Sequence, residues 1–114
     1  MRNHRRHASP LADRARELRA ELARKIALFI GSAENQATDI PGLTLHRRTA
    51  PTAPCSMTYQ PGVTVIAQGR KRVELGRTTF IYDPSRFLLT SIDLPVVSRV
   101  IEATPSVPCL VMSL

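Results

Sequence analysis

The fold is decided by the stretch Val63-Thr64-Val65-Ile66-Ala67-Gln68-Gly69-Arg70-Lys71-Arg72-Val73-Glu74-Leu75-Gly76. It begins with a β-branched run, bends at a glycine, and continues as an alternation of polar and apolar residues. The turn Leu75-Gly76-Arg77-Thr78 then brings 71–75 back against 78–82. The stretch therefore predicts a strand followed by a β-hairpin.

Strand signals continue on both sides of this hairpin. Asp83-Pro84-Ser85-Arg86 favours a type I turn, because aspartate suits its first position and proline its second. The prolines in 50–54 exclude that stretch from a central strand, since proline cannot donate to the ladder. The expected strands outside the hairpin are 43–47, 55–59, 87–91, 96–102 and 109–114. The sequence thus predicts a mainly β protein, built as a small antiparallel barrel or sandwich.

One amphipathic N-terminal helix is expected before the β region, over residues 9–31. Ser9 suits its cap and Pro10 its first position, and Gly31 is suited to end it. Its apolar stripe, at three- and four-residue steps, consists of Leu11, Ala15, Leu18, Leu22, Ile26 and Phe29. Such a stripe needs a partner surface, and two remain open: the chain's own barrel and another subunit.

At 114 residues the chain has room for one domain and an appendage. We expect a flexible basic arm over 1–8, the helix over 9–31, a polar linker over 32–42 that ends in the turn Pro41-Gly42, and the β domain over 43–114. The organisation is one small β domain with a helical appendage.

The net charge of +7 raises the question of nucleic-acid binding. Its positive side chains are spread over the first third of the chain, and Arg70-Lys71-Arg72 is the only basic run in the β region. Because no helix pair of the helix-turn-helix kind follows, we expect no specific DNA binding by this chain. No apolar run reaches the roughly 20 residues that cross a bilayer, and charges occupy the place of a signal peptide's apolar core. We therefore expect a cytoplasmic protein without membrane contact.

Cys55 and Cys109 are the only cysteines. Two distant cysteines without CxxC spacing are usually small buried hydrophobic residues. A disulfide is one alternative. A redox-sensing or aldehyde-reactive thiol is another, and it requires an exposed thiolate near cations. The sequence leaves all three open.

Several strings of the chain resemble those of a known family. They are Ile40-Pro41-Gly42-Leu43, Pro51-Thr52-Ala53-Pro54, Tyr59-Gln60-Pro61, Gln68-Gly69-Arg70-Lys71, Tyr82-Asp83-Pro84 and Leu89-Thr90-Ser91-Ile92-Asp93-Leu94-Pro95-Val96. Over about 40–114 they resemble the N-terminal domain of a group of AraC-type bacterial transcriptional regulators. The resemblance implies a cupin-like β-barrel that senses a small-molecule effector and is joined to a C-terminal pair of helix-turn-helix units.

The resemblance also implies that the chain stops early. It ends at Leu114, in or just after an apolar strand, before the rest of such a regulator. We therefore expect a β domain that is truncated at its C-terminus and has an unpaired edge at its last strand. This edge and the helical stripe predict self-association, most simply as a homodimer.

Catalysis is not expected. A metal in a cupin barrel needs several imidazoles and a carboxylate converging from neighbouring strands. Of the three histidines, His4 and His7 fall in the basic arm, and His46 is expected on the surface of a strand. No catalytic triad, nucleophile elbow or phosphate loop is recognisable. We expect no enzyme, no metal and no cofactor.

A binding module is what remains, with a pocket of apolar walls and a few polar groups. The candidates for these groups are Tyr59, Gln68, Arg70, Tyr82, Ser91 and Asp93. Each also has a structural explanation, such as a solvated bend for Arg70. An inward-facing Arg70 would favour a carboxylate-bearing effector.

Two functions follow as hypotheses. The first is the effector-binding, regulatory domain of an AraC-type transcription regulator, which acts on a DNA-binding domain outside this chain. The second is a stand-alone interaction or dimerisation fragment that pairs with a full-length relative.

Overall fold

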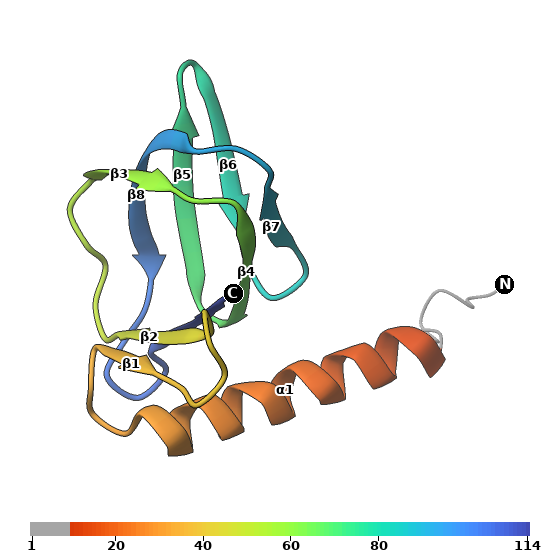
Figure 1. The fold of residues 1–114 in the computed structure, drawn as a ribbon. Coiled ribbons are helices and arrows are strands. Elements are labelled where there is room, and N and C mark those ends of the chain that lie inside the picture. The colour runs from red at the N-terminus through yellow and green to blue at the C-terminus, as the bar shows by residue number, and fades with distance from the viewer. Residues whose placement is uncertain (1–9) are drawn as a thin grey trace, which may run out of the picture.

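The computed structural model describes residues 10–114, which form one helix and nine strands (Figure 1). The elements are α1 (Pro10–Ile30), β1 (Asn35–Ala37), β2 (Thr44–Arg48), β3 (Cys55–Tyr59), β4 (Gly62–Gln68), β5 (Arg70–Leu75), β6 (Thr78–Tyr82), β7 (Phe87–Thr90), β8 (Leu94–Glu102) and β9 (Cys109–Ser113). The predicted basic arm, the cap at Ser9, and the histidines His4 and His7 lie outside the described residues.

The strands form two antiparallel sheets that pack against each other (Figure 1). The five-stranded sheet has the order β1-β2-β9-β4-β7, and the four-stranded sheet has the order β3-β8-β5-β6. The core between them contains Ile66, Val100, Ala103, Cys109 and Val111, with Tyr82 packed against it. The prediction of a mainly β antiparallel barrel or sandwich preceded by one helix is confirmed.

The chain passes from one sheet to the other at Gly69. β4 ends just before this residue in the five-stranded sheet, and β5 begins just after it in the four-stranded sheet. Gly69 has a φ of 92°, which residues with a side chain rarely adopt. β5 then pairs with β6, with Lys71 opposite Tyr82. The predicted hairpin is confirmed, and the glycine before it makes the corner between the two sheets.

The last strand lies inside a sheet, contrary to the prediction of an unpaired edge. β9 pairs with β2 on one side and with β4 on the other. Its apolar sequence fits this place because both of its faces are covered: Leu110 packs under α1, and Val111 lies between the sheets. Self-association therefore gains no support from this strand.

The segment 32–42, predicted as a linker, contains a strand. β1 pairs with β2, with Gln36 opposite Leu45, and the backbone N–H of Arg47 donates to the Glu34 carbonyl at 2.8 Å. All three residues of β1 are exposed. An exposed edge strand carries no apolar alternation, so no periodicity in this segment indicates a strand.

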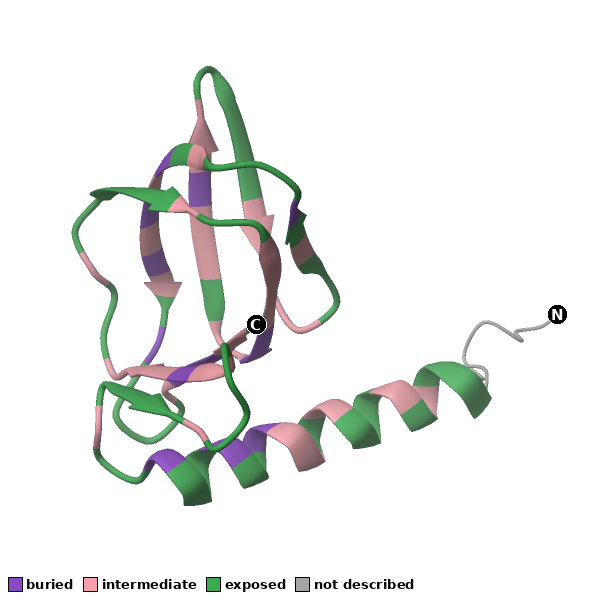
Figure 2. Ribbon diagram, viewed as in Figure 1, coloured by how far each residue is buried: buried purple, intermediate pink, exposed green. Residues whose placement is uncertain are grey.

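α1 docks on the outer face of the five-stranded sheet with its C-terminal half (Figure 1; Figure 2). The helix cluster between them consists of Ala23, Ile26, Ile30, Leu45, Ala67 and Leu110. The two ends of the predicted stripe are not part of it, because Leu11 is 82% and Phe29 57% exposed. The helix therefore packs on the chain's own barrel, but its first turns extend beyond the sheet. No helix within 10–114 is long and apolar enough to span a membrane.

Candidate ligand-binding site

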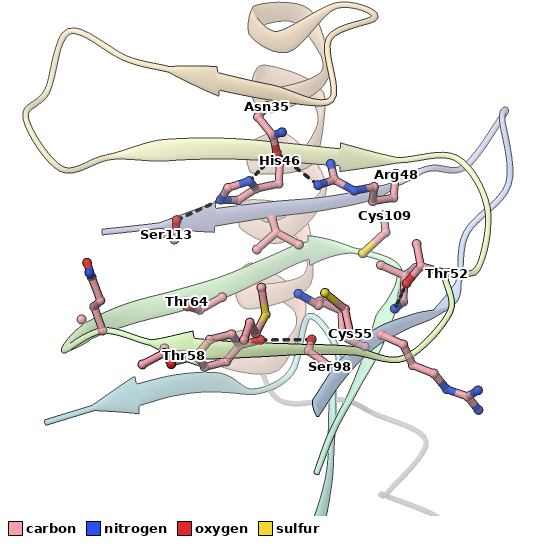
Figure 3. Close-up of a pocket in the computed structure, with 18 of the residues that line it drawn as sticks. Asn35, His46, Arg48, Thr52, Cys55, Thr58, Thr64, Ser98, Cys109 and Ser113 are labelled. Atoms are coloured by element: carbon pink, nitrogen blue, oxygen red, sulfur yellow. Dashed lines mark hydrogen bonds between the residues drawn. The ribbon is translucent and has the colours of Figure 1, made fainter. Parts of the chain in front are cut away.

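A cavity of about 700 Å³, the main cavity, lies between the two sheets (Figure 3). Its volume falls within the range of about 300 to 1,000 Å³ that is typical of small-molecule sites. Its polar lining side chains include Asn35, His46, Arg48, Cys55, Thr58, Tyr59, Thr64, Lys71, Ser98, Cys109 and Ser113. Its apolar lining includes Met57, Val63, Val100 and Val111. The mixture of apolar walls and a few polar groups is that of a binding pocket.

Alternation along the strands explains why these side chains face the cavity. On β2, Leu45 is buried in the helix cluster, so its neighbours on the opposite face point between the sheets. His46 and Arg48 are on that face. On β5, Val73 is buried and Lys71 shares its face. Lys71 therefore approaches the cavity from the sheet opposite to the one that carries His46.

A hydrogen-bond network fixes one wall of the cavity (Figure 3). Asn35 Oδ1 lies 2.9 Å from His46 Nδ1 and accepts from Arg48 Nη2 at 3.2 Å. Because arginine can only donate, the shared atom of Asn35 is an acceptor, and His46 must donate to it from Nδ1. His46 Nε2 lies 3.1 Å from Ser113 Oγ and accepts from it when the ring is neutral. Of the two neutral tautomers of His46, the network therefore selects the one that carries its proton on Nδ1.

The electrostatics of the cavity act on His46 in the same direction. Burial, followed by the positive charges of Arg48 and Lys71, holds the pKa of His46 below its ordinary value of 6.5. The expectation of a surface histidine is therefore wrong: His46 is half-buried and lines the main cavity. Alternation groups Leu43 with Leu45 and places His46 on the opposite, polar face of β2, which a half-buried strand would turn to solvent. Because α1 covers the Leu45 face, the polar face lines the cavity instead.

Tyr59 stands between the main cavity and a smaller one. Its hydroxyl lies 3.2 Å from Ser98 Oγ, and its side chain lines both spaces. The minor cavity, about 260 Å³, is mostly apolar. Its lining includes Tyr59, Val73, Leu75, Phe80, Tyr82, Leu88, Leu89, Ser91, Ile92 and Val96. Of the predicted polar groups, Tyr59 thus lies at the main cavity, and Tyr82 and Ser91 at the minor one.

Tyr82 is placed by packing. Its ring stacks with that of Phe80 at a centroid distance of 6.3 Å and packs against the core between the sheets. Burial, and to a lesser extent the neighbouring Tyr59, raises the pKa of Tyr82 above its ordinary value of 10.0. Its hydroxyl therefore stays protonated at neutral pH.

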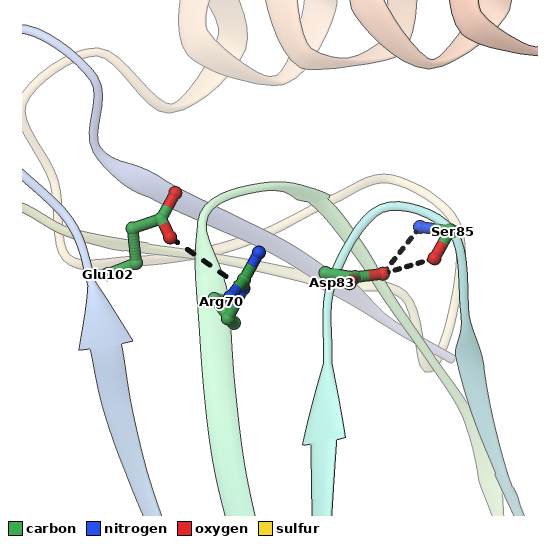
Figure 4. Close-up of polar contacts among 4 residues, drawn as sticks. All are labelled: Arg70, Asp83, Ser85 and Glu102. Atoms are coloured by element: carbon green, nitrogen blue, oxygen red, sulfur yellow. Dashed lines mark hydrogen bonds and ion pairs between the residues drawn. The ribbon is translucent and has the colours of Figure 1, made fainter.

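The other three predicted groups line neither cavity. The Nε2 of Gln68 donates to the Pro108 carbonyl at 2.8 Å, and Asp93 is exposed. Arg70 is also exposed, and its Nε lies 3.7 Å from Glu102 Oε1 (Figure 4). Arg70 does not face inward, so the argument that rested on it for a carboxylate effector does not hold.

The turn after β6 confirms a local prediction. The backbone N–H of Arg86 donates to the Asp83 carbonyl at 3.0 Å, which closes the expected turn. The Asp83 carboxylate accepts from both the hydroxyl and the backbone N–H of Ser85 (Figure 4), and these bonds lower the pKa of Asp83. The turn positions β7, one wall of the minor cavity.

Both cysteines line the main cavity as free thiols, so the disulfide alternative is wrong. Cys55 is exposed, whereas Cys109 is 1% exposed. Burial raises the pKa of the Cys109 thiol, although the charges of Lys71 and Arg48 act in the opposite direction. In the described part of the chain, no three histidine, cysteine or acidic side chains are grouped so that they could hold a metal ion.

The sequence matches the family model described as AraC-type transcriptional regulator N-terminus over residues 39–114. No curated protein matches it significantly. Among solved structures, it is similar to a cupin-2 domain-containing protein from Shewanella frigidimarina, with 9% identity and a TM-score of 0.53, over 81% of this chain and 88% of that one. This likeness supports a cupin-like fold.

Two further solved structures are similar at lower scores. One is a protein of unknown function from Rhizobium leguminosarum, with 18% identity and a TM-score of 0.49, over 79% of this chain and 88% of that one. The other is a putative mannose-6-phosphate isomerase from Ralstonia eutropha, with 14% identity and a TM-score of 0.47, over 73% of this chain and 84% of that one.

Proposed function

The chain belongs to the family of AraC-type transcriptional regulator N-termini, and from this premise we propose that it is a cytoplasmic effector-sensing domain that binds a small molecule in the main cavity. Binding of the effector changes the activity of a DNA-binding domain, which controls transcription. The observation that carries the proposal is the cavity itself: about 700 Å³ between the sheets, with apolar walls and the fixed polar network of Asn35, His46, Arg48 and Ser113.

Binding is favoured over catalysis by the composition of the cavity. Among the described lining residues, His46 is the only histidine and no side chain is a carboxylate. General acid–base chemistry usually needs a pair of titratable groups with distinct roles. DNA contacts are left to another domain, because α1 is the single helix within 10–114 and a helix-turn-helix requires two.

Filling the main cavity is expected to abolish effector binding. Thr64 lines the cavity from β4, so a Thr64→Trp variant places an indole in the space that an effector would occupy. A compound library screened by thermal shift should contain ligands that raise the Tm of the wild-type chain by several degrees. A ligand at about 5 times its Kd adds roughly 1 kcal/mol, which corresponds to about 4 °C for a domain of this size.

Thr79→Trp is the matched control, because Thr79 is exposed on β6 and lines neither cavity. Hits should lose their effect on Thr64→Trp and keep it on Thr79→Trp. Native mass spectrometry of the purified wild-type chain would also detect a ligand that co-purifies with it. Ligands that stabilise both variants equally bind elsewhere and would contradict the proposal.

A second candidate function, self-association as a homodimer, is favoured by exposed leucines in the half of α1 that does not pack on the sheet. Leu11 and Leu18 are 82% and 47% exposed on the turns that extend beyond the sheet. Fully burying a leucine stabilises by roughly 1.5 to 3 kcal/mol, so a second copy that covers these residues would gain several kcal/mol. The alternative function of an interaction fragment that pairs with a longer relative would use the same surface.

A Leu11→Glu, Leu18→Glu double variant is therefore expected to be monomeric at concentrations where the wild type is a dimer. Light scattering at roughly 10 to 100 μM measures this, since that range corresponds to binding free energies near 6 kcal/mol. Thr78→Glu, Thr79→Glu is the control, because it makes the same change in charge on exposed residues of β6. A wild-type chain that is monomeric throughout the range would refute self-association.

A further inference from the structure

The main cavity is lined by basic side chains from both sheets. His46 and Arg48 enter it from β2, and Lys71 enters it from β5. The charges of Arg48 and Lys71 act on both His46 and Cys109. The basic groups therefore converge on one region of the cavity, next to the start of β9.

None of the described residues that line the main cavity is an aspartate or a glutamate, and the charge of Glu102 reaches Cys109 only from outside this lining. Glu102 is 65% exposed and pairs with Arg70. Within residues 10–114, Lys71 has no ion pair. Arg99 of β8 is a third cation among the lining residues, and its alternation with the buried Ser98 and Val100 places it on the opposite face of that strand. Cations in a partly enclosed space whose described lining holds no acidic side chain produce a positive potential there.

Arg48 is held in place and still has donors to offer. Its Nη1 donates to the backbone carbonyls of Glu34 and Arg47 at 2.7 and 2.8 Å, and its Nη2 donates to Asn35 Oδ1. A guanidinium has five N–H donors, and these three bonds leave the Nε–H and one Nη2–H. Such a side chain is preorganised for an oxyanion, because its conformational entropy has already been lost.

The rest of the cavity suits an apolar body. Met57, Val63, Val100 and Val111 line it together with the Tyr59 ring. A small anion alone would leave these walls in contact with water. A molecule with one anionic group and a hydrocarbon or aromatic body would satisfy both parts of the lining.

We propose that the effector is an organic anion, whose carboxylate, sulfonate or phosphate group binds between Arg48 and Lys71 and whose apolar body lies against Met57, Val100 and Val111. The proposal rests on the proposed function, since it names the ligand class of the same cavity. The anionic group supplies the counterion that the lining lacks.

The test compares two probes of the same shape. 8-Anilinonaphthalene-1-sulfonate carries a sulfonate, and N-phenyl-1-naphthylamine is the same skeleton without it; both fluoresce when they enter an apolar site. The wild-type chain should bind the sulfonate about tenfold or more tightly than the neutral probe, as expected for a charge-assisted hydrogen bond in a partly buried site.

Lys71→Met should weaken binding of the sulfonate by about tenfold and leave that of the neutral probe nearly unchanged. Arg70→Met is the matched control. It removes the same charge one residue earlier, from an exposed side chain outside the cavity, where solvent and salt screen its effect. An equal loss in the two variants, or equal binding of the two probes to the wild type, would overturn the proposal.

A measurement on the wild-type chain tests the proposal even if the Lys71→Met variant folds poorly. Arg48 on the same strand and Lys71 on β5 are the charges that act on His46, while β9 presents the neutral Ser113 and Cys109. An anion between those cations should raise the pKa of His46. Proton NMR of the imidazole ring measures this pKa, and the ring signals of His46 are assigned by their loss in His46→Gln. The neutral probe should leave that pKa unchanged. A rise with neither probe would count against the proposal.

The Thr64→Trp variant distinguishes a failure of the anion preference from a failure of the proposed function. If both probes bind equally and Thr64→Trp blocks both, the cavity binds small molecules and only the anion preference is wrong. If Thr64→Trp blocks neither, the probes sit on another apolar surface, and the proposed function fails together with the inference.

Discussion

Replacing Gly69 with alanine is expected to lower the unfolding free energy by more than about 3 kcal/mol, a large part of the roughly 5 to 15 kcal/mol that stabilises a domain of this size. A Cβ at this position would lie 2.8 Å from both Cα and Cβ of Cys109 and 2.9 Å from the Glu102 carbonyl oxygen. These atoms belong to, or are fixed by, the backbone of β8 and β9, so no flexible side chain can move aside. The φ of 92° adds a backbone cost.

Gly76→Ala separates the two costs. Gly76 also has a positive φ, 59°, but a Cβ there would have no atom within 4 Å. Only the left-handed backbone is then penalised, by roughly 1 to 2 kcal/mol. Urea denaturation of the two variants should therefore show a clearly larger loss at Gly69. Equal losses would mean that the corner between the sheets relaxes freely.

The same corner separates the predicted pocket residue Arg70, which is exposed, from its neighbour Lys71, which lines the main cavity. Alternation places side chains correctly only while a strand is regular. The β4–β9 pairing shifts register between Ile66 and Gln68, and the β5–β8 pairing shifts between Arg70 and Lys71. Two irregularities on either side of Gly69 break the phase of the alternation. The exposed Arg70 and the inward-facing Lys71 are thus neighbours. Alternation within β5 assigns Lys71 to the face of Val73, but it does not carry over from β4 across the glycine.

The strands themselves could be predicted closely. Cys55–Tyr59 and Thr78–Tyr82 were placed with their observed bounds, because apolar alternation and turn residues mark both ends. β1 was missed because it is short, polar and exposed. The position of β9 between β2 and β4 was missed for a different reason: local patterns show that a strand is apolar but not which strands flank it.

The candidate site was predictable only in part. Tyr59 was proposed as a pocket residue and lines the main cavity. The convergence of His46 and Lys71 joins strands from different sheets, and this depends on how the sheets face each other, which no local pattern records. The strand pattern predicted the antiparallel barrel or sandwich, and the resemblance to a regulator domain specified that it is cupin-like. The chemistry of the cavity follows only from the three-dimensional arrangement of its lining.

Leu110→Ala is expected to lower the unfolding free energy by about 2 to 5 kcal/mol, as for other buried leucines that leave a cavity. Leu110 is 1% exposed and lies in the helix cluster, where it packs with Ile26 of α1 and Leu45 of β2. β9 is the central strand of its sheet, so neighbouring strands cannot easily close around the missing atoms. Thermal or urea denaturation measures the loss.

Leu28→Ala is the matched control, because Leu28 lies on the docked half of α1 but is 85% exposed. It should change stability by no more than about 0.5 kcal/mol. The two faces of β9 also predict a functional difference. Leu110 points toward α1, whereas Cys109 and Val111 line the main cavity. Leu110→Ala should therefore weaken the fold while the folded fraction still binds its ligand at unchanged affinity. A loss of affinity at temperatures well below the Tm would mean that the helix cluster sets the shape of the cavity.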